Sequence, residues 1–200
     1  TGLPSLSDHQ FRNIIEKAEG VLDKILEDEM KNVREEIKAR GDSSTWICAT
    51  DGFYHIRGSN SDNASAALYD WKTGKVTFRT HRMRRGKKKN YNKTSKSMEG
   101  DMIEELFHQA KEQGFEISGC LLDGDASTHK ALNDIFPQAE IVHCSNHSSK
   151  SFYSQIHQIY EARCSCKGCK RMTLGLLTKI QKTFQNLICN SKTDHSYFKK

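Results

Sequence analysis

The segment from Ile117 to His147 constrains the fold of this chain more than any other stretch. It opens with a short, mainly apolar run, Ile117–Leu122, which predicts a buried strand because the run is brief and is flanked by Gly. Asp123 ends the run, and Gly124 predicts a tight turn directly after it. The first predicted element is therefore a buried strand that ends on a carboxylate.

A helix and a second strand are expected after this turn. The helix is predicted over Thr128–Phe136, because Pro137 cannot continue it. The apolar run Ala139–Val142 predicts the second strand, which leads to Cys144 and His147 in a Cys-x2-His pair. This order of strand, carboxylate, helix, strand and Cys-x2-His is the main indication of function in the sequence.

Composition narrows the class of protein. The 200 residues suffice for one domain with a sizeable core, or for one domain with an extension. The formal net charge of +6 favours a polyanionic partner. The sequence has no apolar run long enough to span a membrane, so no membrane association is expected. Seven Cys without evident secretory features indicate metal ligands or reduced thiols rather than disulfides.

The N-terminal part predicts one long helix over Phe11–Arg40, capped by Ser7 and Asp8 and stopped by Gly41. Its apolar residues recur at steps of three and four, so they form one stripe on a charged helix. This stripe favours packing against the domain that follows, with a partner helix or a homodimer seam as the alternative. Residues 1–43 are thus expected to form a helical extension.

Three strands and a helix are expected between this extension and the segment described first. The strand Thr45–Ala49 is predicted to end at Asp51, Ala64–Trp71 and Lys75–Thr80 to form a hairpin, and Met98–Gln113 to form an amphipathic helix. The complete order predicts an α/β fold with a mixed sheet, in which antiparallel strands come first and strands joined through helices follow.

This element order matches a ribonuclease H-like core with flanking helices, expected here over residues 44–160. In such a core the first and fourth strands are neighbours, so Asp51 and Asp123 would lie close together. A further amphipathic helix is predicted over Met172–Ile188. Residues 161–200 are expected to hold a Cys cluster and the start of a helical insertion.

Two neighbouring aspartates have a specific chemical consequence. Ionised carboxylates about 4 Å apart repel by roughly 4 kcal/mol at an effective dielectric constant of 20. Such a pair is stable when a cation lies between the carboxylates or when one of them takes a proton. Carboxylate oxygens suit Mg²⁺ or Mn²⁺, and two such ions can drive phosphodiester chemistry. The alternative is ordinary turn chemistry, because Asp before Gly is common in turns.

Two stretches of the sequence resemble motifs of the Mutator-like element transposases. The region from Leu121 (LLDGDAS) through Phe136-Pro to Cys144-x2-His is similar to the second-aspartate region of that family. Upstream, Asp51-Gly-Phe-Tyr-His-Ile-Arg57-Gly is similar to the first-aspartate motif, and Met98-Glu-Gly resembles the stretch before the central helix of the family. The resemblance covers residues 46–152 and less surely the remainder.

The resemblance implies a function. It assigns Asp51 and Asp123 as the first two acids of a DDE triad in a transposase that cuts and joins DNA strands. The implied cofactors are Mg²⁺ or Mn²⁺, and the implied partners are transposon ends and target DNA, with no membrane and no small-molecule substrate. A non-catalytic, domesticated DNA-binding regulator with the same fold is one alternative. The other alternative is a ribonuclease H-like nuclease, although nucleases of that kind lack the Cys-x2-His pair that this chain carries.

The third acid of the triad has no match. The family places a Glu after a helical insertion, whereas Glu161 follows Cys144 too closely and predicts a solvated helix residue. The catalytic Glu is therefore expected beyond Lys200, so that these residues alone would be inactive. Asp125 is a substitute for Asp123, although it lies beyond the apolar run.

Zinc is a second expected metal. Cys144 and His147 have metal-ligand spacing, and Cys164, Cys166 and Cys169 supply three further thiols; zinc needs four such ligands. The alternative for Cys144 is a small buried residue at a strand end, and for His147 a residue at a helix N-terminus.

A basic loop over residues 81–96 completes the list of candidate sites. It contains no acid, so its charges are expected to contact DNA phosphates. The alternative is a solvated loop or a nuclear localisation signal, and we expect the protein in the nucleus. The candidate DNA-binding residues are Arg57, Arg82, Arg84, Arg85, Lys87, Lys88, Lys89, Lys93 and Lys96.

Overall fold

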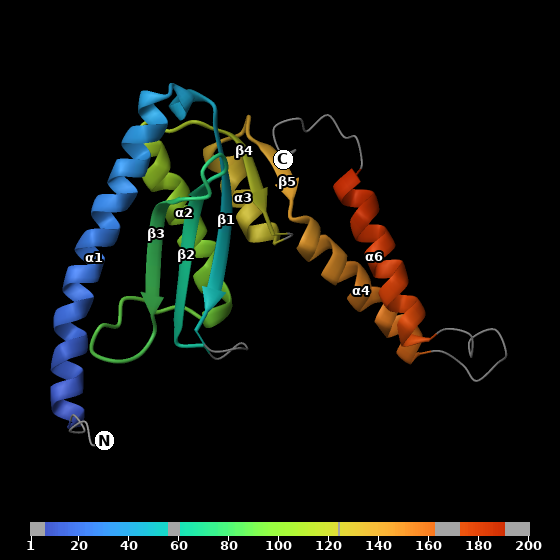
Figure 1. Ribbon diagram of the computed structural model, residues 1–200, viewed down its shortest axis with the longest axis horizontal. Coiled ribbons are helices and arrows are strands. Elements are labelled where there is room, and N and C mark those ends of the chain that lie inside the picture. The colour runs from blue at the N-terminus through green and yellow to red at the C-terminus, as the bar shows by residue number, and fades with distance from the viewer. Residues whose placement is uncertain (1–6, 56–60, 124, 163–172, 191–200) are drawn as a thin grey trace, which may run out of the picture.

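The computed structural model describes residues 7–55, 61–123, 125–162 and 173–190. A long N-terminal helix lies beside a mixed sheet, and a pair of helices extends from the opposite side (Figure 1). The elements are α1 (Asp8–Ala39), η1 (Asp42–Ser44), β1 (Trp46–Tyr54), β2 (Asn63–Asp70), β3 (Val76–Met83), α2 (Ser95–Glu112), β4 (Ile117–Leu122), α3 (Ala126–Ile135), β5 (Glu140–His143), α4 (Ser145–Glu161) and α6 (Leu174–Asn190).

The five strands form one sheet in the order β3-β2-β1-β4-β5. β1, β2 and β3 are antiparallel neighbours, whereas β4 runs parallel to β1 and β5 runs parallel to β4. Each parallel connection contains a helix, as parallel pairing requires. This arrangement confirms the predicted ribonuclease H-like fold, and it makes the first and fourth strands direct neighbours.

The core lies between the sheet and the helices α1 and α2. Residues of β2 alternate between a half-exposed and a buried face, and Ala64, Ala66 and Leu68 point inward. Helix α2 packs on β2 and β3 through an apolar face that includes Met102 and Leu106, both fully buried. The inward-facing residues of the strand and the apolar face of the helix therefore pack in one core, as their sequence patterns predict.

Helix α1 is anchored by its C-terminal half. Ser7 caps its first turn as predicted, in a capping box with Gln10. Arg34 is buried, donates to the Thr77 carbonyl at 2.7 Å and lies 5.1 Å from the centre of the Phe78 ring. Residues 11–25 instead leave their large apolar side chains exposed, at 57% for Phe11, 51% for Ile14, 63% for Leu22 and 58% for Ile25. Packing on the domain is thus confirmed for only part of the predicted stripe.

The first strand is longer than predicted. It continues through Asp51 to Tyr54, because β2 pairs with it in the register Asp51 to Ala67 and Tyr54 to Ala64. This pairing satisfies the backbone of the Asp-Gly step, so the tertiary partner overrides the local turn preference. Asp51 consequently lies within the strand, and the prediction that the strand ends there was wrong.

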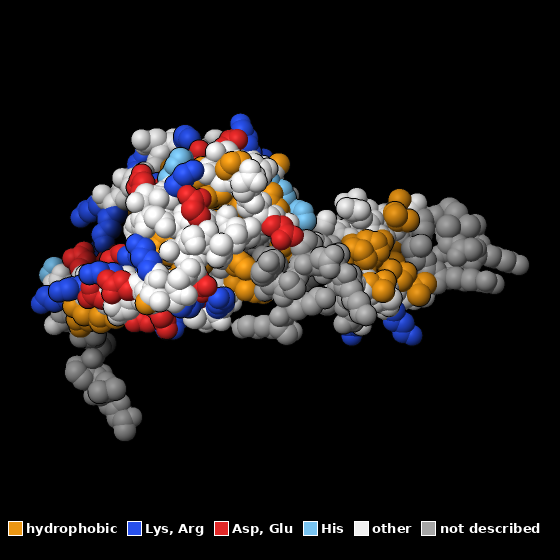
Figure 2. Space-filling model, turned by 90° about the horizontal axis from the view of Figure 1, so that it is seen from above, with side chains coloured by type: hydrophobic (Ala, Val, Ile, Leu, Met, Phe, Trp, Pro, Cys, Tyr) orange, Lys and Arg blue, Asp and Glu red, His pale blue; other side chains and the backbone are white. Residues whose placement is uncertain are grey.

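The C-terminal helices form a separate pair beside the sheet (Figure 1). α4 and α6 contact each other, with the Phe152 and Phe184 rings stacked at 4.1 Å. α6 confirms the helix predicted over Met172–Ile188. Hydrophobic side chains are exposed on this pair, as Figure 2 shows, including Ile159 at 61% and Leu187 at 65%. Within the described residues, no helix combines the length and the apolar character needed to cross a membrane.

Candidate active site

The register of β1 and β4 brings the two predicted aspartates together. Ala49 pairs with Leu121 in the parallel ladder, and Asp51 and Asp123 each lie two residues further along their own chain segments. Both line a cavity of about 10 Å³ with Thr50, Gly52, Glu99, Ile103 and Thr128. A polar cavity of this size holds roughly one water molecule or ion. The predicted proximity of the aspartates is therefore found in the structure.

Glu99 is a third acidic residue at this cavity, and it was not among the site residues predicted from the sequence. It lies on α2 four residues before Ile103, on the face of the helix that packs against the sheet. Burial raises the pKa of Glu99 to about 7, and the negative charges of Asp123, Asp125 and Asp51 contribute further. The signal in the sequence was an acid at a core-facing position of an amphipathic helix.

Two glycines allow the elements around Glu99 to approach each other. A Cβ atom at Gly52 would lie 2.8 Å from Glu99 Oε1 and 2.9 Å from Glu99 Cγ. A Cβ atom at Gly100 would lie 2.6 Å from Ser127 Oγ, where α2 meets α3. Both contacts are shorter than real Cβ contacts, so the absence of a side chain brings Glu99 against β1 and α2 against α3.

Asp123 is held from two sides. Its backbone carbonyl lies 3.1 Å from His129 Nε2 of α3, and its Oδ1 lies 2.7 Å from His147 Nδ1 of α4. Burial raises the pKa of Asp123, His147 opposes this increase, and Asp51 adds to it. Burial is therefore the main cause of the raised pKa values of both Asp123 and Glu99, and the neighbouring carboxylates add to it.

Asp125 has a structural role instead. It is the N-cap of α3, and its Oδ2 accepts hydrogen bonds from the backbone N–H and the hydroxyl of Thr128, both at 3.2 Å. The hydrogen bond from Ser127 Oγ, together with those from Thr128, holds the pKa of Asp125 below its usual value. A carboxylate used in this way is an ordinary helix cap, so the geometry favours Asp123 over Asp125 as the site residue.

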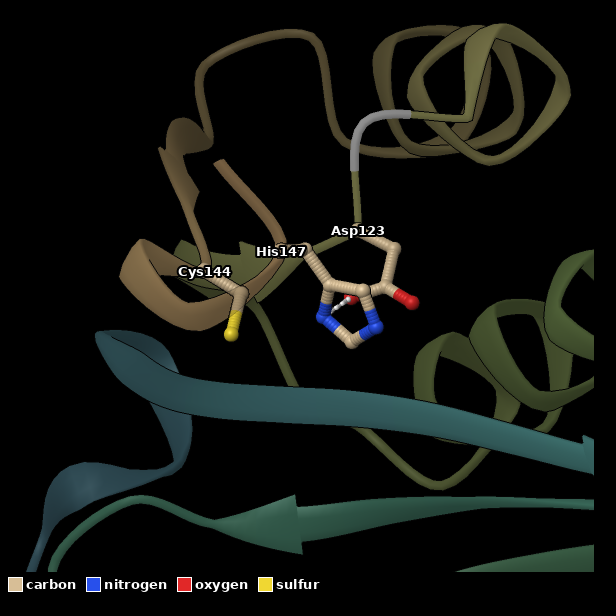
Figure 3. A group of neighbouring side chains, drawn as sticks. All are labelled: Asp123, Cys144 and His147. Carbon is tan, nitrogen blue, oxygen red and sulfur yellow. Dashed lines mark ion pairs between the residues drawn. The ribbon is translucent and has the colours of Figure 1, made fainter. Parts of the chain in front are cut away.

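The Cys-x2-His pair lies next to Asp123. The donor atoms of Asp123, Cys144 and His147 all lie within 4.8 Å of one another, and Figure 3 shows the three side chains next to one another. Cys144 is the N-cap of α4, yet its side chain makes no capping hydrogen bond. The predicted ligands Cys164, Cys166 and Cys169 lie outside the described residues.

The cavity fits a hard divalent cation. Most of the residues that line it carry carboxylate or hydroxyl oxygens, the ligand type that Mg²⁺ and Mn²⁺ prefer. Thr50 lines the same cavity, and its Oγ1 is buried without a hydrogen-bond partner among the described residues. A buried hydroxyl without a partner is costly, and a cation or its bound water would satisfy it. Asp51, Asp123 and Glu99 are the residues that would hold the ion, and their side chains would move closer together to do so, because their carboxylate oxygens do not all lie within 4.8 Å of one another.

The basic loop differs from its prediction. Its first residues, through Met83, belong to β3, and α2 begins at Ser95. Acids from other elements pair with most of its charges. The pairs are Arg82 with Glu105, Arg84 and Arg85 with Asp62, Lys88 with Glu19, and Lys93 with Asp101. The expectation of uncompensated charge was therefore wrong for these five residues, because distant segments supply the acids.

Three lysines between residues 81 and 96 have no acidic partner among the described residues. Lys87, Lys89 and Lys96 are exposed, and the structure gives them no ion pair with another described residue. Tyr91 is 7% exposed and donates its hydroxyl to Asp101 at 2.6 Å, so it is not placed to stack on a base. Arg57 lies outside the described residues.

The sheet order, with carboxylates on β1 and directly after β4, defines a ribonuclease H-like domain. Residues 1–200 match the family model of the Mutator-like transposases, and the chain belongs to this family. Among solved structures, it is similar to RNase H1 from the halophilic archaeon Halobacterium salinarum NRC-1. That similarity has a TM-score of 0.33 and 14% sequence identity, and it covers 50% of this chain and 86% of the other. The comparison with curated proteins found no match.

Proposed function

We propose that this chain is a catalytic core of a DDE-type DNA transposase, in which Asp51, Asp123 and Glu99 bind the catalytic divalent cations. Family membership supports the transposase class. The observation that carries the catalytic proposal is the cavity that Asp51, Asp123 and Glu99 line together with Thr50, whose hydroxyl has no partner among the described residues. Mg²⁺ or Mn²⁺ bound there would activate a water or a 3′-hydroxyl and stabilise the leaving oxygen of a DNA phosphodiester.

The three acids have different parts in this proposal. Asp51 is exposed on β1 and is the acid most open to an approaching DNA strand. Asp123 is oriented by His147, which fixes one carboxylate oxygen at 2.7 Å. Glu99 carries a proton up to a pH of about 7 and is expected to release it when a cation binds, because ligands must be deprotonated.

DNA is the proposed partner, in the form of transposon ends and a target site. Lys87 and Lys89 of the loop and Lys96 in the first turn of α2 are best placed to contact phosphates, since their charge is not paired within the described residues. We also propose a nuclear location, because the basic loop resembles a nuclear localisation signal and a DNA transposase acts where the DNA is. The glutamate expected after the helical insertion stays a prediction, and Glu161 is exposed at the end of α4, 3.8 Å from His157.

Titration with Mn²⁺, followed by the electron paramagnetic resonance of the free ion, tests the proposal. The parent protein should bind Mn²⁺, and Asp51→Asn and Asp123→Asn should each weaken binding by at least about tenfold, since each removes a charged ligand. Asp134→Asn is the matched control, because Asp134 is exposed on α3 away from the cavity. Equal Mn²⁺ affinity in all four proteins would contradict the catalytic proposal. DNA binding without Mn²⁺ binding would instead support a non-catalytic regulator.

A further inference from the structure

We propose that Asp123, Cys144 and His147 form a second metal site, which binds Zn²⁺ or another borderline-soft cation and thereby withdraws Asp123 from the catalytic cation. The proposal rests on the proposed function only in its second half, since the site itself is defined by the three side chains. It assigns the Cys-x2-His pair to metal-dependent inhibition of the active site.

The backbone already holds the three residues in place. The Cys144 N–H donates to the Leu122 carbonyl at 3.0 Å, which fixes the start of α4 against the end of β4, one residue before Asp123. Cys144 and His147 are three residues apart at the start of α4, so they lie on the same side of its first turn. Three donors from two adjacent elements are therefore assembled without a metal.

The distances suit a small tetrahedral ion. The donor atoms lie within 4.8 Å of one another, and His147 Nδ1 is 2.7 Å from Asp123 Oδ1. Zinc bonds of about 2.0–2.3 Å to N, O and S place neighbouring ligands roughly 3.3–3.8 Å apart. An ion would replace the proton between His147 and Asp123 after a small movement of the side chains. The His147 side chain has room for this movement, because 48% of it is exposed.

The chemistry of the donors selects the metal. Thiolate and imidazole favour Zn²⁺ and Co²⁺, whereas Mg²⁺ and Mn²⁺ prefer oxygen ligands. The Cys144 thiol is half-buried and is not used to cap α4, so it is free to bind. Three protein ligands leave a fourth position for water, which is the pattern of an open zinc site.

The position of Asp123 connects this site to the catalytic cavity. Asp123 lines the cavity with Asp51 and Glu99, and its Oδ1 also contacts His147. A cation held by Cys144 and His147 would draw this charge away and would repel a second dication nearby. Zinc at this site is therefore expected to weaken Mn²⁺ binding rather than to support it.

Cobalt spectroscopy of the full chain tests the site. Co²⁺ should produce a thiolate-to-metal charge-transfer band in the near ultraviolet, and Cys144→Ser and His147→Ala should each weaken Co²⁺ binding by at least about tenfold. The measurement is made in a background with Cys164, Cys166 and Cys169 changed to Ser, so that their thiols do not contribute. Asp51→Asn is the matched control and should keep the band, since Asp51 is not one of the three ligands. Circular dichroism identifies any variant that has not folded, and Cys144→Ala replaces Cys144→Ser in that case.

A competition experiment tests the inhibition. Saturating Zn²⁺ should raise the Mn²⁺ dissociation constant by at least about tenfold in the parent, and by much less in Cys144→Ser. A missing charge-transfer band, or one that Cys144→Ser leaves intact, overturns the inference, while the effect of Asp51→Asn on Mn²⁺ still tests the catalytic proposal separately. A cobalt band without Mn²⁺ binding would refute the catalytic proposal and leave the soft-metal site standing.

Discussion

Glu99→Gln should stabilise the metal-free protein above neutral pH. Burial and three neighbouring carboxylates raise the pKa of Glu99 from 4.5 to about 7. Between these values the folded protein holds a proton that the unfolded chain has released. The folded state therefore loses stability as pH rises through this interval, because ionising Glu99 inside the cavity is unfavourable. Glutamine has nearly the same shape and no charge, so it removes this cost.

The magnitude follows from the two pKa values. The difference between about 7 and 4.5 corresponds to roughly 3 kcal/mol at about 1.4 kcal/mol per pH unit. Glu99 is only half-buried, and solvent screening reduces the expected gain to about 1–2 kcal/mol. For a domain of this size the gain raises the melting temperature by roughly 2–8 °C at pH 8. At pH 4.5 the folded protein holds the proton and the unfolded chain holds it about half of the time, so the variant and the parent should differ by less than about 0.5 kcal/mol.

Thermal unfolding followed by circular dichroism, with a chelator present, measures this effect at pH 4.5 and pH 8. Glu112→Gln is the matched control, because Glu112 is exposed in the last turn of the same helix. It should change stability by less than about 0.5 kcal/mol at either pH. A Glu99→Gln variant that is destabilised at pH 8, or that gains equally at both pH values, would refute the reasoning. With Mn²⁺ added at pH 8, the parent should have the higher melting temperature, because the Glu99→Gln variant lacks one charged ligand.

Two further predictions concern the same site and the loop. Gly52→Ala should displace Glu99, weaken Mn²⁺ binding in the titration above and cost about 1–3 kcal/mol of stability in thermal melts, because its Cβ would lie 2.8 Å from Glu99 Oε1. Gly20→Ala is the control, because a Cβ atom there meets open space, and it should stabilise the protein by up to about 1 kcal/mol. If Gly52→Ala is as stable as this control, the proposed contact between residue 52 and Glu99 is excluded. Combined Lys87→Ala and Lys89→Ala should flatten the dependence of log K on log salt for duplex DNA by up to about 2, with the same loss on every sequence. Lys93→Ala, which removes a lysine paired with Asp101, should change this slope less, and an unchanged slope in the double variant would mean that the loop does not contact phosphates.

Local pattern predicted most of the fold. The strand Ile117–Leu122 was predicted to the residue, because a short apolar run between glycines has few other solutions. The strand order and the proximity of Asp51 and Asp123 were also predicted, since both follow from the order of the elements. The end of β1 was missed, because pairing with β2 is a long-range effect that an Asp-Gly step does not reveal.

The parts that failed depend on contacts between distant segments. Glu99 reads as an ordinary helix charge until the fold places it against Gly52 and the two aspartates. The basic loop has no acid in its own sequence, yet Glu19 of α1 lies 2.6 Å from Lys88. In both cases the local sequence described the chemistry of each residue correctly, but it did not show which residues the fold would bring together.

The most direct test of the central claim is the position of a bound metal. Crystals grown with Mn²⁺ should give an anomalous scattering peak in the cavity between Asp51, Asp123 and Glu99, with carboxylate oxygens at about 2.1 Å. The peak should disappear in crystals of Asp51→Asn. Manganese bound elsewhere in the protein, with no peak between these carboxylates, would contradict the account.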